Sequence, residues 1–134
     1  MNFLKGIKRN SLLRKLIAFS AALRFGFPGR YLTIIGITGT TGKTTTAFMI
    51  KNILEANGIK TGLISTAGYF IGDEIIYPKA HVPGTTPDPF FLHFLLRRMV
   101  RKSLKAVVIE VSSFGLMYER VYGLNFSAAV LSNI

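Results

Sequence analysis

The segment Gly39–Thr45, which reads GTTGKTT, constrains the fold more than any other feature of this sequence. It follows Tyr31–Ile37, a run rich in apolar and β-branched residues, as in strands buried on both faces of a parallel sheet. After the loop, apolar residues recur at helical spacing and predict the buried face of a helix that ends near Asn57 and Gly58: Ala47, Ile50, Ile53 and Leu54. This strand–loop–helix unit predicts an α/β fold.

The residue types in this loop suit the binding of phosphate. Glycines let the backbone curl so that successive N–H groups point toward phosphate oxygens, and the following helix adds its positive end. Lys43 can reach the β- and γ-phosphates of a nucleotide, and the Thr44 hydroxyl can ligate Mg²⁺. The match to the G-x-x-x-x-G-K-[ST] pattern is incomplete, because Ile37 occupies the first glycine position. The alternative is a Gly/Thr-rich turn with a solvated lysine, but the position between strand and helix favours a P-loop.

The rest of the chain supplies further strands and one more helix. The pattern predicts, in order, a strand at Lys60–Thr66, a hairpin at Tyr69–Tyr77, a helix opened by Thr86, Pro87 and Asp88, a strand at Ala106–Val111 and the start of another at Ala128–Leu131. The second helix has an apolar stripe of Phe91, Leu92, Leu95 and Met99. We therefore expect a mostly parallel sheet flanked by helices, with right-handed crossovers.

Residues 1–30 differ in character from residues 31–134, and we treat them as a separate basic helix. They contain no acidic residue and seven basic ones: Lys5, Lys8, Arg9, Arg14, Lys15, Arg24 and Arg30. Apolar residues recur at helical spacing and predict an amphipathic helix: Leu13, Leu16, Ile17, Leu23 and Phe27. Its longest uncharged run, Leu16–Leu23, is short for a signal peptide. Two alternatives stay open: the helix lies on an anionic membrane surface, or it packs on the adjacent domain.

The net charge of +11 invites comparison with nucleic-acid-binding proteins. The charge is concentrated in residues 1–30 and in a second cluster, Arg97, Arg98, Arg101 and Lys102, and no nucleic-acid-binding motif accompanies either. We do not expect nucleic acid as a partner. The chain has no cysteine, which excludes disulfides and thiolate metal sites and fits a cytoplasmic location.

Three segments, in order, resemble the Mur ligases, and the resemblance covers residues 31–134. Gly39–Thr45 resembles their ATP loop, which lacks the first glycine and usually has Asn in place of Thr41. Gly84–Asp88 resembles the Thr-Thr substrate-binding motif of the UDP-N-acetylmuramyl-tripeptide synthetases. Glu110–Ser113, followed by Arg120 and Val121, resembles their Glu-Val-Ser-Ser…Arg-Val segment. Residues 125–134 are similar to the strand that leads to their next metal-site motif.

The resemblance implies the cofactors ATP and Mg²⁺ and assigns roles to single residues. The ATP-binding residues would be Gly39, Thr40, Thr41, Gly42, Lys43, Thr44 and Thr45; the catalytic residues Lys43 and Glu110; the metal ligands Thr44 and Glu110; and the substrate-binding residues Thr85, Thr86, Ser112 and Arg120. A carboxylate at the end of an apolar strand also suits a hard cation on general grounds, although a solvated strand-capping Glu110 is the alternative. Thr85 and Thr86 have an alternative role as caps of the following helix.

By this resemblance, the complete enzyme would be an ATP-dependent ligase of peptidoglycan synthesis. It would join an amino acid to a UDP-N-acetylmuramoyl peptide through an acyl phosphate. We expect this chain to be an incomplete fragment that binds ATP and does not ligate alone, with residues 1–30 in place of the family's uridine-binding domain. The sequence departs from the family at Gly84, Phe114 and Tyr118, where Asn, His and Gln are usual. Two alternatives are a folylpolyglutamate-synthetase-like ligase and a non-catalytic, membrane-apposed nucleotide-binding module.

Overall fold

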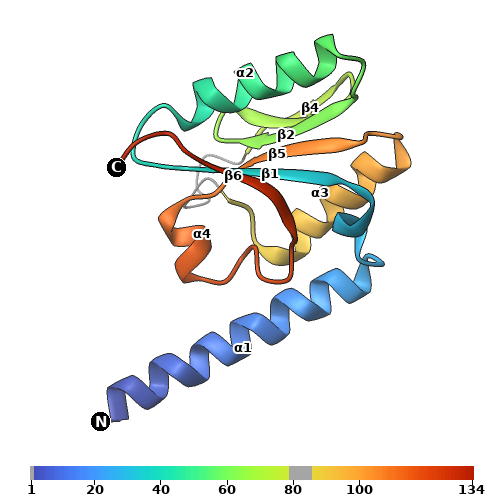
Figure 1. Cartoon of the computed structure of the whole chain (residues 1–134). Coiled ribbons are helices and arrows are strands. Elements are labelled where there is room, and N and C mark those ends of the chain that lie inside the picture. The colour runs from blue at the N-terminus through green and yellow to red at the C-terminus, as the bar shows by residue number, and fades with distance from the viewer. Residues whose placement is uncertain (1, 79–85) are drawn as a thin grey trace.

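The sheet of this protein has six strands in the order β4-β3-β2-β5-β1-β6, with helices on both faces (Figure 1). The computed structural model describes residues 2–78 and 86–134, and side chains from residue 10 onward within those ranges. The strands are β1 Thr33–Thr38, β2 Thr61–Ser65, β3 Gly68–Ile71, β4 Glu74–Ile76, β5 Ala106–Glu110 and β6 Phe126–Leu131. The helices are α1 Asn2–Arg24, the 3₁₀ turn η1 Pro28–Tyr31, α2 Lys43–Ala56, α3 Pro89–Arg101 and α4 Ser113–Met117.

Parallel pairing organises the centre of the sheet. β1 lies between β5 and β6, with Ile37 opposite Glu110 on one side and Val130 on the other. β2 pairs with β5 in the same direction, and β3 and β4 extend the sheet as an antiparallel hairpin. Because parallel strands end at a common edge, the residues that follow β1, β2, β5 and β6 come together there. The expected fold class, a mostly parallel α/β sheet flanked by helices, is confirmed.

The two faces of the sheet are buried by different helices. Along β5, Val107 and Ile109 point to one face and Val108 to the other, as the two-residue period of a strand requires. α3 covers the first face with its buried side chains Leu92, Leu95, Leu96 and Met99. α2 covers the second with Ala47, packed near Ile37 and Leu63. The predicted burial of Ile53 is wrong: its side chain is 60% exposed, because the smaller cluster under α2 involves only the earlier turns of that helix.

The start of α3 also differs from the prediction. The sequence suggested that Thr86 caps the helix with Pro87 in its first turn. Instead α3 begins at Pro89, and the Asp88 carboxylate accepts a hydrogen bond of 3.2 Å from the Phe91 N–H. Asp88, two residues after Thr86, is the side chain that is free to cap, because Thr86 is fully buried elsewhere. The short helix α4 was not predicted.

α1 runs along the outside of the domain, below α3 and α4 in Figure 1. The side of α1 that faces the domain carries small side chains: Ala18, Ala21 and Ala22 are buried there. The apolar face predicted from the sequence points elsewhere: Leu13, Leu16, Ile17 and Leu23 are all exposed. The helix therefore packs on its neighbour through alanines, because small side chains let two helices approach closely, and it leaves its larger apolar residues uncovered.

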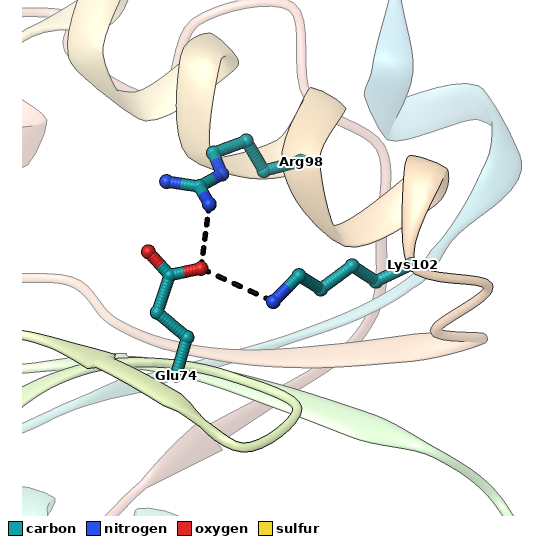
Figure 2. A network of polar contacts seen from close by, with 3 residues as sticks. All are labelled: Glu74, Arg98 and Lys102. Carbon is teal, nitrogen blue, oxygen red and sulfur yellow. Dashed lines mark hydrogen bonds and ion pairs between the residues drawn. The ribbon is translucent and has the colours of Figure 1, made fainter.

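A three-residue ion network fastens the β3–β4 hairpin to α3 (Figure 2). Glu74 of β4 accepts from the Arg98 guanidinium at 2.5 Å and from the Lys102 ammonium at 3.1 Å. The hydrogen bond from Lys102, together with the nearby Arg98 charge, lowers the pKa of Glu74. Two of the four residues of the second basic cluster, Arg98 and Lys102, thereby hold the edge strand β4 to α3. The number of charges in the sequence did not indicate this role.

His93 is an exception among the buried residues of α3. Its side chain is 2% exposed, and neither ring nitrogen has a hydrogen-bond partner among the described residues. It lines a cavity of about 260 Å³ together with Phe19 and Ala22 of α1. Burial lowers the pKa of His93 to about 4, because the charged imidazolium is poorly solvated there.

This burial predicts a pH-dependent stability. The pKa of His93 is about 4 in the folded state and 6.5 in the unfolded state. Between these pH values the unfolded state therefore binds more protons. The stability of the fold falls as the pH falls through that range. We expect the free energy of unfolding to drop by up to about 2 kcal/mol between pH 7 and pH 5. His93→Leu should flatten this slope in denaturant titrations. The comparison is made in a His81→Gln background, which removes the other imidazole, and an unchanged slope would contradict the assignment.

Candidate functional site

The candidate site lies at the edge where the parallel strands end. Thr38, Ser65, Glu110 and Leu131 are the last residues of β1, β2, β5 and β6. The loop that leaves β1 crosses this edge and enters α2, and the chain's C-terminus lies beside the same loop (Figure 1). In open α/β sheets this edge is where ligands bind, because side chains from several strands converge there.

The glycines of the loop have conformations that their neighbours require. Gly39 has φ of 139°, and a Cβ added to it would lie 2.1 Å from Ser132 Oγ, so no larger residue fits. Gly42 has φ of 80° in the left-handed region, which glycine adopts without strain. A Cβ on Gly42 would meet no atom within 4 Å. The first glycine thus allows close packing inside the protein, and the second borders open space.

The start of α2 is open to a ligand. Gly42 is its N-cap, no side chain caps the first turn, and that turn contains no acidic residue. The N–H groups of a helix start carry partial positive charge and favour anions. The Lys43 ammonium folds back and donates a hydrogen bond of 2.7 Å to the Gly39 carbonyl. A cavity of about 210 Å³ lies here, lined by Thr40, Thr41, Gly42, Lys43, Thr44, Thr45, Thr66 and Glu110.

The first half of the loop is fastened to the segment after β6. The side-chain oxygen of Asn133 accepts hydrogen bonds from the N–H groups of Thr40 and Thr41, at 2.9 and 3.1 Å. The Ser132 hydroxyl donates to the Thr41 carbonyl at 2.7 Å. Sequence reasoning missed both residues. Their signal is positional: they directly follow a strand that pairs with β1, so they arrive at the same edge as the loop.

Glu110 is the buried charge of the site. Its side chain is fully buried, so the alternative of a solvated, strand-capping glutamate is wrong. Oε2 accepts from the Thr66 N–H at 3.1 Å and from the Thr66 hydroxyl at 3.4 Å. Oε1 has no hydrogen-bond partner among the described residues. A buried carboxylate oxygen without a partner is costly, so this atom marks a position where a ligand would be stabilising.

Thr44 and Glu110 are brought together by Thr66. The Thr44 and Thr66 hydroxyls lie 3.1 Å apart, and the Thr66 hydroxyl in turn donates to Glu110. One hydroxyl therefore separates the two residues that the sequence assigned to a metal. Thr66, which directly follows β2, was not predicted, although its place at the end of a strand parallel to β5 indicates it.

Thr86, Ser112 and Arg120 form a cluster behind Glu110. The Thr86 hydroxyl donates to the Glu110 carbonyl at 3.2 Å and accepts from the Ser112 N–H at 3.1 Å, and the Arg120 guanidinium donates to the Thr86 carbonyl at 2.6 Å. The Ser112 hydroxyl caps α4 by accepting from the Gly115 N–H. These contacts brace the strand end that carries Glu110. The substrate-binding role of the three residues stays a prediction, and Thr85 and Gly84 lie outside the described residues.

Two positions that depart from the family pattern lie close together, Phe114 in α4 and Tyr118 directly after it. The rings of Phe114 and Tyr118 stack with centroids 6.1 Å apart, and both side chains are exposed. The Arg14 guanidinium of α1 lies 4.5 Å above the Tyr118 ring. The residues that replace the usual His and Gln therefore take part in an aromatic surface that contacts α1.

Comparison with known proteins gives a consistent result. A family model described as the Mur ligase middle domain matches residues 37–134. The UDP-N-acetylmuramoyl-L-alanyl-D-glutamate--2,6-diaminopimelate ligase of Clostridium perfringens is 45% identical over 121 residues, which are 90% of this chain and 24% of that protein. The ligase of the same name from Chlamydia trachomatis is 41% identical, over 88% of this chain and 24% of that protein.

A solved structure supports the same relationship. A structure titled as a UDP-N-acetylmuramoyl-L-alanyl-D-glutamate--2,6-diaminopimelate ligase superimposes with a TM-score of 0.67 at 30% sequence identity, covering 76% of this chain and 20% of that one. The chain spans about a quarter of the length of the curated relatives it matches. With the loop, the parallel sheet and these relatives in agreement, the chain belongs to the Mur ligase family, whose middle domain residues 37–134 match.

Proposed function

We propose that the cavity at the start of α2 binds the phosphates of ATP and that Thr44 and Glu110 hold the accompanying Mg²⁺. One observation carries this proposal. Glu110, whose Oε1 is buried and has no partner among the described residues, lines the same cavity as Lys43 and the uncapped start of α2. A lone carboxylate beside an anion-binding loop would repel phosphate, unless a cation lies between them. The pairing of these two features therefore favours a metal-bound nucleotide over a simple anion.

The residues present fit Mg²⁺. Magnesium prefers hard oxygen ligands, keeps several of its waters and is commonly held by one or two carboxylates together with substrate phosphates. The site offers the Glu110 carboxylate and the hydroxyls of Thr44 and Thr66. No group of three His, Cys, Asp or Glu that could hold a metal occurs in residues 2–78 and 86–134. When bound, the ion would neutralise charge on the phosphate oxygens.

The chain's own residues would supply positioning and charge. Lys43 would exchange its bond to the Gly39 carbonyl for the β- and γ-phosphates, and the first N–H groups of α2 would bind their oxygens. Because Asn133 already holds the amides of Thr40 and Thr41, the loop keeps its curvature without a ligand. These are fixed positive groups aimed at a transferring phosphoryl group, the kind of arrangement that stabilises a transition state.

We extend the proposal to the whole ligase to which such a middle domain contributes. It would transfer the γ-phosphoryl group of ATP to the carboxylate of a UDP-N-acetylmuramoyl peptide, and the amine of an amino acid would then displace the phosphate. The names of the relatives support this substrate class, and 2,6-diaminopimelate is the amino acid in those names. ATP and UDP-linked precursors are cytoplasmic compounds, so we place the enzyme in the cytoplasm. Thr85, Thr86, Ser112 and Arg120 remain the proposed substrate-binding residues.

The first test removes the lysine. Lys43→Ala should weaken Mg·ATP binding by about tenfold or more, because a hydrogen bond to a charged group contributes roughly 1.5–3 kcal/mol. Isothermal titration calorimetry on the 134-residue chain measures this directly. Lys60→Ala is the matched control: it removes the same charge from an exposed residue that precedes β2, at the opposite edge of the sheet. Equal affinities for the wild type and Lys43→Ala would overturn the loop assignment.

The second test concerns the metal. Glu110→Gln keeps an acceptor for the Thr66 N–H and removes the charge, so the fold is preserved while the cation loses its carboxylate. We expect Mg²⁺ to strengthen ATP binding in the wild type and to have little effect in the variant. ATP without Mg²⁺ should bind the variant as well as or better than the wild type, because the repulsion is gone.

Glu74→Gln is the control for this second test, since it removes one carboxylate from the hairpin surface and none from the site. It should keep the full response to Mg²⁺. The metal assignment is wrong if Glu110→Gln keeps it too.

A further inference from the structure

The outward face of α1 carries a row of large apolar side chains that we call the leucine stripe: Leu12, Leu13, Leu16, Phe19 and Leu23. Their exposed fractions are 60, 56, 55, 52 and 60%. At 3.6 residues per turn these positions fall within about a third of the helix circumference. Burying such side chains is favourable, so a continuous exposed row on one helix face marks an interaction surface.

The orientation of α1 is fixed by the opposite face. Ala18, Ala21 and Ala22 are buried on the domain. The Ser11 hydroxyl donates to Glu119 at 3.0 Å, and Lys15 lies 5.4 Å above the Tyr122 ring. Turning the leucine stripe inward would break these contacts and would insert bulky side chains where alanines now fit. The packing therefore leaves more than half of each stripe side chain exposed, while Phe19 and Leu23 also line cavities beside the domain.

A basic groove begins where the leucine stripe ends. Leu23 lines a cavity of about 510 Å³ together with Arg24, Phe25, Gly26, Phe94, Arg97, Arg98 and Arg101. Arg98 is paired with Glu74, whereas Arg24, Arg97 and Arg101 form no ion pair among the described residues. Residues 1–30 contain seven basic residues, Arg24 among them, and no acid. The apolar row and a strong positive charge thus occupy the same end of the molecule.

We propose that α1 lies flat on an anionic lipid bilayer, with the leucine stripe among the acyl chains and Arg24, Arg97 and Arg101 on the lipid phosphates. Amphipathic helices with basic flanks bind membranes in this way, through apolar burial combined with attraction to anionic lipids. No helix within the described part of the chain is long and apolar enough to cross a membrane. This inference does not rest on the proposed nucleotide site.

The charge distribution selects the bilayer over two other occupants. A second copy of the chain would bring two segments of like charge together, which is unfavourable at close range. A nucleic acid would satisfy the arginines but would leave the apolar stripe in water. An anionic membrane satisfies both features at once. Figure 1 shows α1 and α2 on opposite sides of the sheet, so α2 lies away from the lipid when α1 lies on the bilayer.

Co-sedimentation with vesicles tests the proposal. The chain should sediment with vesicles that contain phosphatidylglycerol, and binding to vesicles of phosphatidylcholine alone should be at least about tenfold weaker and insensitive to salt. Leu16→Glu should weaken binding to the anionic vesicles by about tenfold or more, since it removes apolar burial at the centre of the stripe. The matched control is Ile53→Glu, because Ile53 on α2 is 60% exposed and lies outside the stripe. That variant should bind as the wild type does.

The arginines are tested separately. Replacing Arg97 and Arg101 together by Gln should weaken binding to anionic vesicles and leave the weak binding to neutral ones unchanged. Lys60→Gln with Lys105→Gln removes the same charge elsewhere, and we expect a smaller loss. Circular dichroism checks the fold of each variant. Lys43→Ala should keep vesicle binding, and Leu16→Glu should keep nucleotide binding, so failure of one proposal is distinguishable from failure of the other.

Several results would overturn the inference. The first is no sedimentation with either vesicle. The second is an equal loss in Leu16→Glu and Ile53→Glu. A third is a dimer, seen by analytical ultracentrifugation without lipid and abolished by Leu16→Glu, which would make the stripe a contact between copies. The last is tight, salt-dependent binding to RNA together with no vesicle binding, which would assign the charge to nucleic acid.

Discussion

The parallel pairing of β1 with β5 and β6 is the constraint on which the rest of the molecule depends. It places the end of β1 beside Glu110 on one side and beside Ser132 and Asn133 on the other. The loop, its buried carboxylate and the residues that fasten the loop are far apart in the sequence, yet one hydrogen-bonding register brings them to a single edge. The position of the site therefore depends on strand direction more than on any single side chain.

The protein fixes the Glu110 carboxylate in place without neutralising its charge. One carboxylate oxygen is satisfied by Thr66, and the backbone on its far side is held by Thr86, which Arg120 and Ser112 contact in turn. These contacts fix the position of the carboxylate and leave Oε1 without a partner. Residues singled out as substrate-binding candidates thus also have a structural task.

The sequence predicted the elements of the fold well because their signals are local. Buried strands appear in the sequence as apolar runs, and the loop appears as glycines followed by Lys43 at the start of a helix. Thr66, Ser132 and Asn133 escaped prediction because their roles arise from strand order and register, which no local pattern encodes. Ile53 was misplaced, and the surroundings of the apolar residues of α1 stayed open, for a related reason: helical periodicity identifies an apolar face without saying what it packs against. The capping of α3 was decided by tertiary contacts of Thr86.

The anchoring of the loop by Asn133 divides its amides into two groups. The N–H groups of Thr40 and Thr41 are bonded to Asn133, whereas the start of α2, which lines the cavity, has no side-chain cap. Ordering a flexible loop costs conformational entropy, and here part of that cost is met during folding instead of during binding. The loop is preorganised by an asparagine that need not touch the nucleotide. A change at Asn133, some 90 positions away along the chain, would therefore alter the rigidity of the loop without altering the groups that bind phosphate.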